Sequence, residues 1–292
     1  MGSLTGIISA MLSAACFGML AVLGKLAYAR GFEAAEILQY RFGFGALMLL
    51  VWFAATNRSV LRAGPKTLLK AGFLGVVLYP VQSLSFMSSL KYVPAATSSL
   101  ILYFYPVAVT LLSALIFRTR LDRVVGISLL LLVAGCGLVF FDAFLRDISR
   151  TGLMLATLSM LIFSTYLICL EWLLRGENPI TVSFYCVLAA SIVWTIVSPP
   201  VRFMEFDMQT KALTLALGLV PTALAVTLLY RSVDLIGSSS ASICSTLEPI
   251  TTVLASALLL GEAVMPIQIA GMALILFGIV LPNAQAARLK RS

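Results

Sequence analysis

The chain has little charge and no histidine, and both deficits restrict what it can be. Only 11% of its 292 residues are Asp, Glu, Lys or Arg, whereas a soluble globular domain averages about 25%. Hydrophobic residues make up 61% of the chain, so polar side chains are too few to cover a surface that faces water. The composition therefore excludes an ordinary soluble domain and predicts a protein whose main solvent is lipid.

Motifs for metal, redox and nucleotide chemistry are also missing. The five cysteines lie singly in apolar stretches, without a CxxC pair, and their odd number argues against a disulfide framework. A zinc site needs clustered Cys, His or carboxylate ligands, and no GxxxxGK[ST] run marks a P-loop. We therefore expect no metal, no cofactor and no enzymatic activity, although a site built from carboxylates alone stays open.

The net charge of +8 comes from basic residues in the short connections between apolar runs. Twelve of the 20 Lys and Arg residues fall on the side of the N-terminus and seven on the other side, while Arg41 lies inside a run. By the positive-inside rule, this bias predicts that both termini lie in the cytoplasm. We read the basic residues as orientation signals and expect no nucleic-acid partner.

Ten apolar runs of about 20 residues follow one another, which is the length that a helix needs to cross a bilayer. The predicted helices cover residues 4–28, 33–55, 67–90, 94–117, 122–141, 151–174, 180–198, 211–234, 238–260 and 264–283. No connection is long enough to form a separate soluble domain. The sequence thus predicts an all-α polytopic membrane protein with ten transmembrane helices.

The two halves of the chain resemble each other. Pro106 aligns with Pro249 at a shift of 143 residues, and Gly31 aligns with Gly176 at a shift of 145. Because five helices per half is an odd number, the second half must enter the membrane the opposite way round. This inverted repeat, typical of secondary transporters, places a central cavity between the halves. The predicted repeats are residues 1–145 and 146–292, within one integral membrane domain.

The stretch from Ser238 to Glu262 contains the strongest functional candidate. It is long enough to span the membrane, yet Glu248 stands near its middle and Pro249 follows directly. A carboxylate at that depth costs roughly 2.5 to 3.5 kcal/mol, and proline breaks or kinks the helix. This pattern predicts a face that lines a cavity. Glu248 is expected to act as a proton site or as the partner of a substrate amine; a neutral carboxyl hydrogen-bonded between helices is the structural alternative.

Arg41 lies inside the second predicted helix, roughly 12 Å deep at 1.5 Å per residue. Arginine does not lose its charge in a protein, so it needs a carboxylate, backbone carbonyls or water. Two interpretations follow. Arg41 binds the carboxylate of a substrate, or it forms a structural pair within the protein.

Polar and aromatic side chains in apolar helices complete the predicted site. Its further substrate-binding members are Tyr79, Gln82, Tyr103, Tyr105, Tyr166 and Tyr230. Aromatic rings suit flat or amphipathic solutes through stacking and cation–π contact, and packing between helices is the alternative for each ring. Helix breaks and matched charges near helix ends predict gating positions, with snorkelling to the interface as the alternative for the charges. These positions are Pro80, Pro106, Pro221, Pro249, Lys25 and Glu171.

Two glycines are expected at close helix contacts. Gly126 and Gly271 occupy the fifth and tenth predicted helices, and small residues let helix backbones approach closely in a membrane. Such contacts form within one chain or between two copies. A monomer and a homodimer therefore both stay open.

Together these features resemble the EamA-type drug/metabolite transporters, over essentially the whole chain. The resemblance rests on ten helices in two repeats, on Arg41-Phe42, on a proline in the fourth and ninth helices, and on Leu260-Gly261-Glu262. It implies export of amino acids or other small metabolites across the bacterial inner membrane, and YddG-like aromatic amino-acid exporters are a similar group. The repeats differ where Phe117-Arg118-Thr119 replaces Leu260-Gly261-Glu262.

The sequence therefore predicts a secondary transporter that exports small metabolites, above all amino acids, by alternating access. The alternatives are an exporter of drugs, nucleosides or other metabolites, and a membrane scaffold without transport activity. A channel agrees less well, because no repeated ring of charges or filter-like loop is visible. Proton antiport through Glu248 and facilitated diffusion both stay open.

Overall fold

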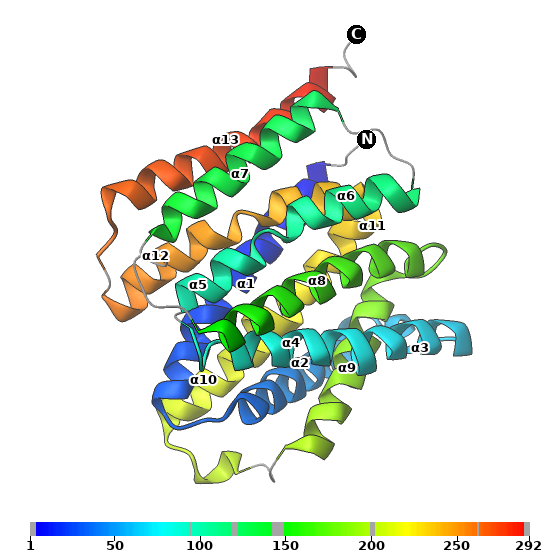
Figure 1. The fold of residues 1–292 in the computed structure, drawn as a ribbon. Coiled ribbons are helices and arrows are strands. Elements are labelled where there is room, and N and C mark those ends of the chain that lie inside the picture. Colours follow the sequence, from blue (N-terminus) through cyan, green and yellow to red (C-terminus); the bar gives the residue numbers. More distant parts are fainter. Residues whose placement is uncertain are drawn as a thin grey trace.

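The computed structural model describes residues 4–93, 95–117, 122–141, 149–198, 202–261 and 263–288, and every regular element among them is a helix (Figure 1). The apolar runs of the sequence thus form helices, as expected. The elements are α1 (Leu4–Ala29), α2 (Ala34–Thr56), η1 (Arg58–Leu61), α3 (Pro65–Gly72), η2 (Phe73–Leu78), α4 (Tyr79–Ser89), α5 (Ala95–Leu102), α6 (Tyr105–Phe117), α7 (Arg123–Val139), α8 (Arg150–Leu173), α9 (Pro179–Val197), η4 (Phe203–Glu205), α10 (Met208–Gly218), η5 (Leu219–Leu224), α11 (Ala225–Ser245), α12 (Glu248–Leu260) and α13 (Pro266–Arg288).

Seven helices within the described residues are long and apolar enough to cross a membrane. The shorter apolar helices are Arg123–Val139, Glu248–Leu259 and Pro266–Pro282. Large apolar side chains on these shorter helices, such as Leu130, Leu258 and Phe277, are exposed, which suits a surface in contact with lipid. The helices lie at the predicted places, whereas ten membrane crossings stay a prediction.

Two of the long helices contain a π turn. The element η2 joins α3 to α4, and η5 joins α10 to α11, so that each trio forms one continuous helix. The two π turns lie 146 residues apart. The same distortion therefore occurs at corresponding places in the two halves of the chain, and π turns are frequent at functional sites.

Other helices are broken near a proline or a glycine. Two residues separate α5 from α6, and two residues separate α11 from α12. Pro106 and Pro249 are the second residues of α6 and α12, where a missing N–H costs no helical hydrogen bond. Inside α11, Gly237 has φ 76° and ψ 163°, a conformation that glycine adopts without strain. Residues 238–245 therefore form a separate half-helix.

The turns after α1 and α8 share a second feature. Gly31 has φ 82° and Gly176 has φ 76°, in the left-handed region that glycine tolerates best. These are the two glycines that align between the halves of the sequence. The same turn therefore follows the first helix of each half.

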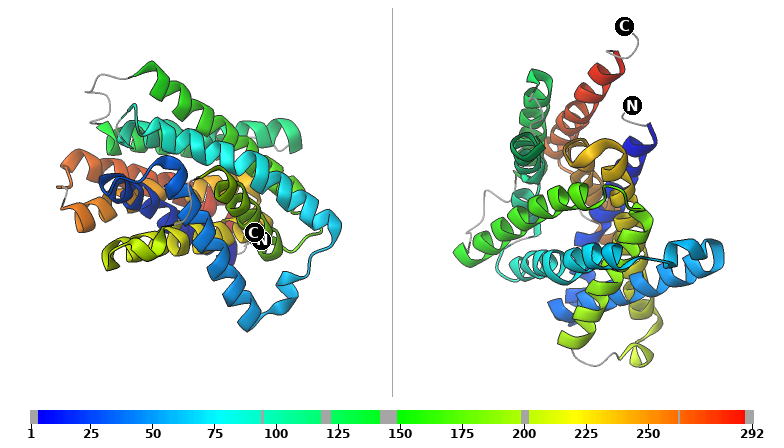
Figure 2. Two further views of the ribbon diagram at one scale, coloured as in Figure 1. Left: turned by 90° about the horizontal axis from the view of Figure 1, so that it is seen from below. Right: turned by 90° about the vertical axis from the view of Figure 1, so that its right-hand side faces the viewer.

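α7 and α13 lie side by side at one edge of the molecule (Figure 1). A Cβ atom at Gly271 would lie 2.6 Å from the carbonyl oxygen of Gly135, so the two backbones are in direct contact. The packing expected of Gly271 is present within the chain. Gly126 makes no such contact within the described part of the chain, because a Cβ there would meet no described atom within 4 Å, and a contact of Gly126 between two copies stays a prediction. The start of α1 and the end of α13 lie at the same end of the molecule (Figure 2).

Candidate functional site

A cavity of about 50 Å³ lies between helices from both halves of the chain, α1, α2, α4, α5, α8 and α12. Five of the predicted substrate-binding residues border it, namely Glu248, Arg41, Tyr79, Gln82 and Tyr103. On this measure one water molecule needs about 10–15 Å³, so the cavity has room for a few waters. A larger solute requires the surrounding helices to move.

Arg41 is 2% exposed and is held by three hydrogen bonds to neutral oxygens. Its Nε donates to Thr222 Oγ1 at 3.0 Å, while its Nη2 donates to the Tyr79 hydroxyl at 2.8 Å and to the Pro221 carbonyl at 3.2 Å. The guanidinium carbon also lies 4.9 Å from the Phe42 ring centre and 5.6 Å from that of Tyr79. These contacts stabilise the cation without neutralising its charge.

Glu248 is the first residue of α12, where the helix dipole favours a negative group. Its carboxyl interacts with the Tyr103 hydroxyl and with the charge of Arg41. α12 begins close against α1, since a Cβ at Gly18 would lie 2.8 Å from the Glu248 carbonyl oxygen. Thr252 Oγ1 also donates to the Gly18 carbonyl at 3.1 Å. Close contact between two helices thereby holds Glu248 at the cavity that Arg41 also borders.

Gln82 and Tyr103 occupy defined positions in the wall. The Gln82 amide donates from Nε2 to Ser159 Oγ at 3.1 Å and accepts from Ser83 Oγ at 3.3 Å. The Tyr103 ring stacks on Phe140, with 5.7 Å between ring centres and 19° between planes. One amide and one phenol are therefore held beside the two charged groups.

Three predicted residues back the wall without bordering the cavity. The hydroxyls of Tyr166 and Tyr230 lie 2.6 Å apart, and both residues are fully buried. The Tyr166 ring packs on Tyr79 at 5.3 Å between centres, and the Tyr105 ring contacts Phe163 edge-on at 4.9 Å. Other side chains contact these rings, and the Tyr166 and Tyr230 hydroxyls contact each other, so a role of the three residues in substrate binding stays a prediction.

The predicted gating residues fall into three environments. Pro221 lies inside η5, and Pro80 is the second residue of α4, which follows η2 directly. Lys25 is exposed near the end of α1. Glu171 is engaged with the half-helix, since its Oε2 accepts from the backbone N–H of Ser238 at 2.7 Å and from the Ser238 hydroxyl. Glu171 thus caps residues 238–245.

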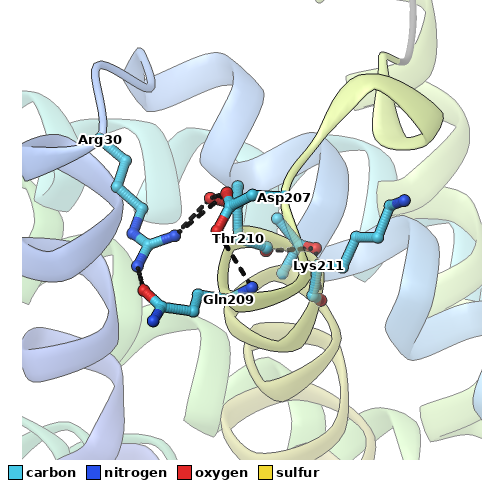
Figure 3. Close-up of polar contacts among 6 residues, drawn as sticks. Arg30, Asp207, Gln209, Thr210 and Lys211 are labelled. Carbon is cyan, nitrogen blue, oxygen red and sulfur yellow. Dashed lines mark hydrogen bonds and ion pairs between the residues drawn. The ribbon is translucent and has the colours of Figure 1, made fainter.

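A polar cluster between α1 and α10 was not expected from the sequence (Figure 3). Arg30 pairs with Asp207 at 3.5 Å and donates to Gln209 Oε1 at 2.9 Å and to Thr210. Asp207 also caps α10 by accepting from the Gln209 N–H at 3.1 Å. The Thr210 hydroxyl, the Gln209 N–H and Arg30 lower the pKa of the Asp207 carboxyl. An Asp directly before an apolar run was the only available signal.

Sequence reasoning also missed part of the cavity wall. Phe17, Phe86 and Phe163 border the cavity, but they are three of 17 phenylalanines spread over apolar helices, so composition does not single them out. Thr222, which binds Arg41, was missed although it follows Pro221. Among the described residues, no group of three or more His, Cys, Asp or Glu side chains is placed to hold a metal ion.

Apolar helices around a cavity with charged side chains are typical of a membrane transporter. The chain matches the EamA-like transporter family over residues 4–141 and again over residues 150–283, and it belongs to this family. This assignment confirms the resemblance in the sequence.

Curated relatives and a solved structure are similar to this chain. The pseudopaline exporter CntI of Pseudomonas aeruginosa, in strains UCBPP-PA14 and PAO1, is 26% identical over 220 residues, which cover 74% of either chain. One solved crystal structure matches with TM-score 0.79 and 19% identity, covering 97% of this chain and 98% of its own. That likeness shows the fold alone.

Proposed function

We propose that this protein is a secondary transporter that exports a small metabolite, an amino acid in the first place, across the bacterial inner membrane. The observation that carries the proposal is the placement of Arg41 and Glu248 on one interior cavity. A cation and a carboxyl on the same cavity match the carboxylate and the amine of a zwitterion. The family of the chain and the exporter activity of its relatives support transport in the outward direction.

Alternating access follows from the proposed architecture of ten helices in two inverted five-helix repeats, residues 1–145 and 146–292. Three observations support the repeats: the family matches twice, the π turns η2 and η5 correspond, and so do Gly31 and Gly176. With the charge bias of the connections, both termini lie in the cytoplasm.

Aromatic amino acids fit the cavity wall well. The rings of Phe17, Phe86, Phe163, Tyr79 and Tyr103 border it, and such rings bind a flat solute by stacking. The activity of the relatives, pseudopaline export, keeps larger metabolites as the second candidate class. Drugs and nucleosides remain alternative solutes on the same wall.

Counterflow in proteoliposomes tests the proposal. Vesicles are preloaded with one unlabelled amino acid at a time. A labelled amino acid is then added outside, and its accumulation inside the vesicles is measured. Accumulation against a preload establishes a carrier and names its solute. If folded protein accumulates no amino acid, the amino-acid assignment fails and nucleosides, drugs and amino-carboxylate metabolites are screened next. Absence of counterflow with every class would leave a membrane scaffold.

A further inference from the structure

Two of the three bonds that hold Arg41 come from a single turn in the other half of the chain. Thr222 Oγ1 and the Pro221 carbonyl, both in η5, accept from Arg41 Nε and Nη2 at 3.0 Å and 3.2 Å. Thr222 is completely buried. The orientation of a cavity cation on α2 is therefore set by a π turn about 180 residues away in sequence.

Proline at position 221 explains why the Thr222 hydroxyl is an acceptor at this place. Pro221 has no N–H, so it cannot donate to the Leu217 carbonyl four residues earlier. The Thr222 hydroxyl donates to that carbonyl instead, at 3.0 Å. This bond uses the only hydroxyl proton, and the lone pairs of the oxygen are left for Arg41 Nε. In this contact Arg41 Nε is therefore the donor and the Thr222 hydroxyl oxygen is the acceptor.

Glycine makes the close approach of α2 to this turn geometrically feasible. A Cβ at Gly45, one turn beyond Arg41, would lie 2.7 Å from Thr222 Cγ2 and 3.2 Å from the Gly218 carbonyl oxygen. A Cβ at Gly218 would lie 2.9 Å from the Gly45 nitrogen. A side chain at either position would push α2 away from η5. The contact between Arg41 and Thr222 thus belongs to a closely fitted helix crossing.

We propose that Thr222 is a positioning residue that sets the selectivity of the cavity for carboxylate-bearing solutes. The three bonds of Arg41 use Nε and both hydrogens of Nη2, and Nη1 takes part in none of them. Holding the guanidinium in this orientation leaves the two N–H groups of Nη1 for a solute oxygen. This inference rests on the proposed function, because it assigns the carboxylate of the exported solute to Arg41.

Three variants separate positioning from general stability. Thr222→Val keeps the shape and removes the hydroxyl, whereas Thr222→Ser keeps the hydroxyl. Thr214→Val is the matched control, because Thr214 is a buried threonine of α10 whose hydroxyl, among the described residues, bonds to the carbonyls of Thr210 and Lys211 in its own helix and to no other group. For each variant, KM and kcat are measured with an amino acid and with its carboxamide analogue.

We expect Thr222→Val to raise KM for the amino acid roughly tenfold, the scale of one hydrogen bond to a charged group. KM for the carboxamide stays unchanged, so the preference for the carboxylate is lost. Thr222→Ser and Thr214→Val retain that preference. An equal change of KM for both solutes in Thr222→Val overturns the proposal, since a merely structural role predicts it.

A second measurement needs no solute. It therefore tests the positioning role of Thr222 even if the wild-type protein transports no amino acid. Phenylglyoxal modifies arginine, and mass spectrometry reports its rate at Arg41 relative to the exposed Arg58 of the same sample. Loss of the bond to Thr222 should raise this relative rate severalfold in Thr222→Val but not in Thr222→Ser. An unchanged rate overturns the positioning role, whereas a raised rate with no transport by the wild type overturns only the proposed function.

Discussion

Arg41 and Glu248 show how two expensive side chains are accommodated in a lipid-facing protein. An isolated charge in the membrane costs several kcal/mol, but hydrogen bonds and aromatic rings surround Arg41, and Glu248 borders the same cavity. Each group therefore has polar or charged neighbours. The hydrogen bonds just described do not join Arg41 and Glu248 directly to each other. This residual capacity is what a solute with opposite charges requires.

Replacing Arg41 by Ala should weaken export of carboxylate-bearing solutes about 10- to 100-fold, the scale of a lost hydrogen bond to a charged group. Neutral analogues should change far less. Arg41→Lys is the matched control, because it keeps the charge but lacks the planar guanidinium. Its export of carboxylate-bearing solutes should lie between that of the wild type and that of Arg41→Ala. Initial rates over a concentration series measure the effect. An equal loss for charged and neutral solutes would favour a structural role for Arg41.

Glu248→Gln tests proton coupling. The amide keeps a hydrogen-bonding group next to Tyr103 and removes the exchangeable acid, so the protein should fold while losing gradient-driven export. Export is measured between pH 6 and 8 with and without an imposed proton gradient, and passive counterflow serves as the control. Unaltered gradient-driven export by the variant over this range would show that Glu248 is not the proton site.

Helix breaks organise the elements around the cavity. The half-helix 238–245 begins after Gly237 and ends before Glu248, so it lies between two points where the backbone departs from a helix. Its N-terminus is held from α8 by the Glu171 carboxylate. Because the backbone departs from a helix at both ends, the half-helix can move as a unit relative to its neighbours. This supports the gating role proposed for Glu171.

Removing that cap should loosen the half-helix. Glu171→Ala is expected to cost about 1 kcal/mol, as for other N-cap losses, and to speed hydrogen exchange at the first amides of residues 238–245. Glu171→Gln keeps an acceptor oxygen and should show a smaller effect. Hydrogen exchange followed by mass spectrometry gives the rates, with the α7–α13 pair as internal reference. Unchanged exchange in Glu171→Ala would refute the cap as a stabilising contact.

At the scale of the whole molecule, the proposed alternating access requires the two halves to move against each other. Thr110 on α6 and Ser239 on the half-helix connect the halves through hydroxyl oxygens 3.1 Å apart. Ion pairs near helix ends also join the halves, for example Arg30 with Asp207 and Lys70 with Glu177. Hydrogen bonds from Thr67 and Lys70 lower the pKa of Glu177, so the latter pair is intact at neutral pH.

A disulfide between Thr110→Cys and Ser239→Cys should arrest export, and a reductant should restore it. The hydroxyl separation is compatible with a bridge after small adjustments, and the experiment uses a background without native cysteines. Ser89→Cys with Ser98→Cys is the control pair, because those hydroxyls are 2.8 Å apart within the first half. Full export by the oxidised Thr110→Cys/Ser239→Cys protein would show that this contact does not change during the cycle.

The sequence determined much of this protein. Run length and composition determined that lipid is the solvent and where helices lie, because each depends only on neighbouring residues. Pro106 and Pro249 indicated the breaks, since proline is tolerated in the first turn of a helix and not in its interior. Arg41 and Glu248 stood out because a charge in an apolar run is costly in any fold.

Only the tertiary structure decided which side chains share the cavity. Tyr79 and Tyr103 border it while Tyr166 and Tyr230 bind each other behind it, although all four are similar tyrosines in apolar helices. Such distinctions depend on helix rotation and on partners far apart in the chain, as with Arg41 and Thr222. The local sequence shows that burying a polar or charged side chain is costly. Only the packing of helices that are distant in the chain decides which partner that side chain contacts.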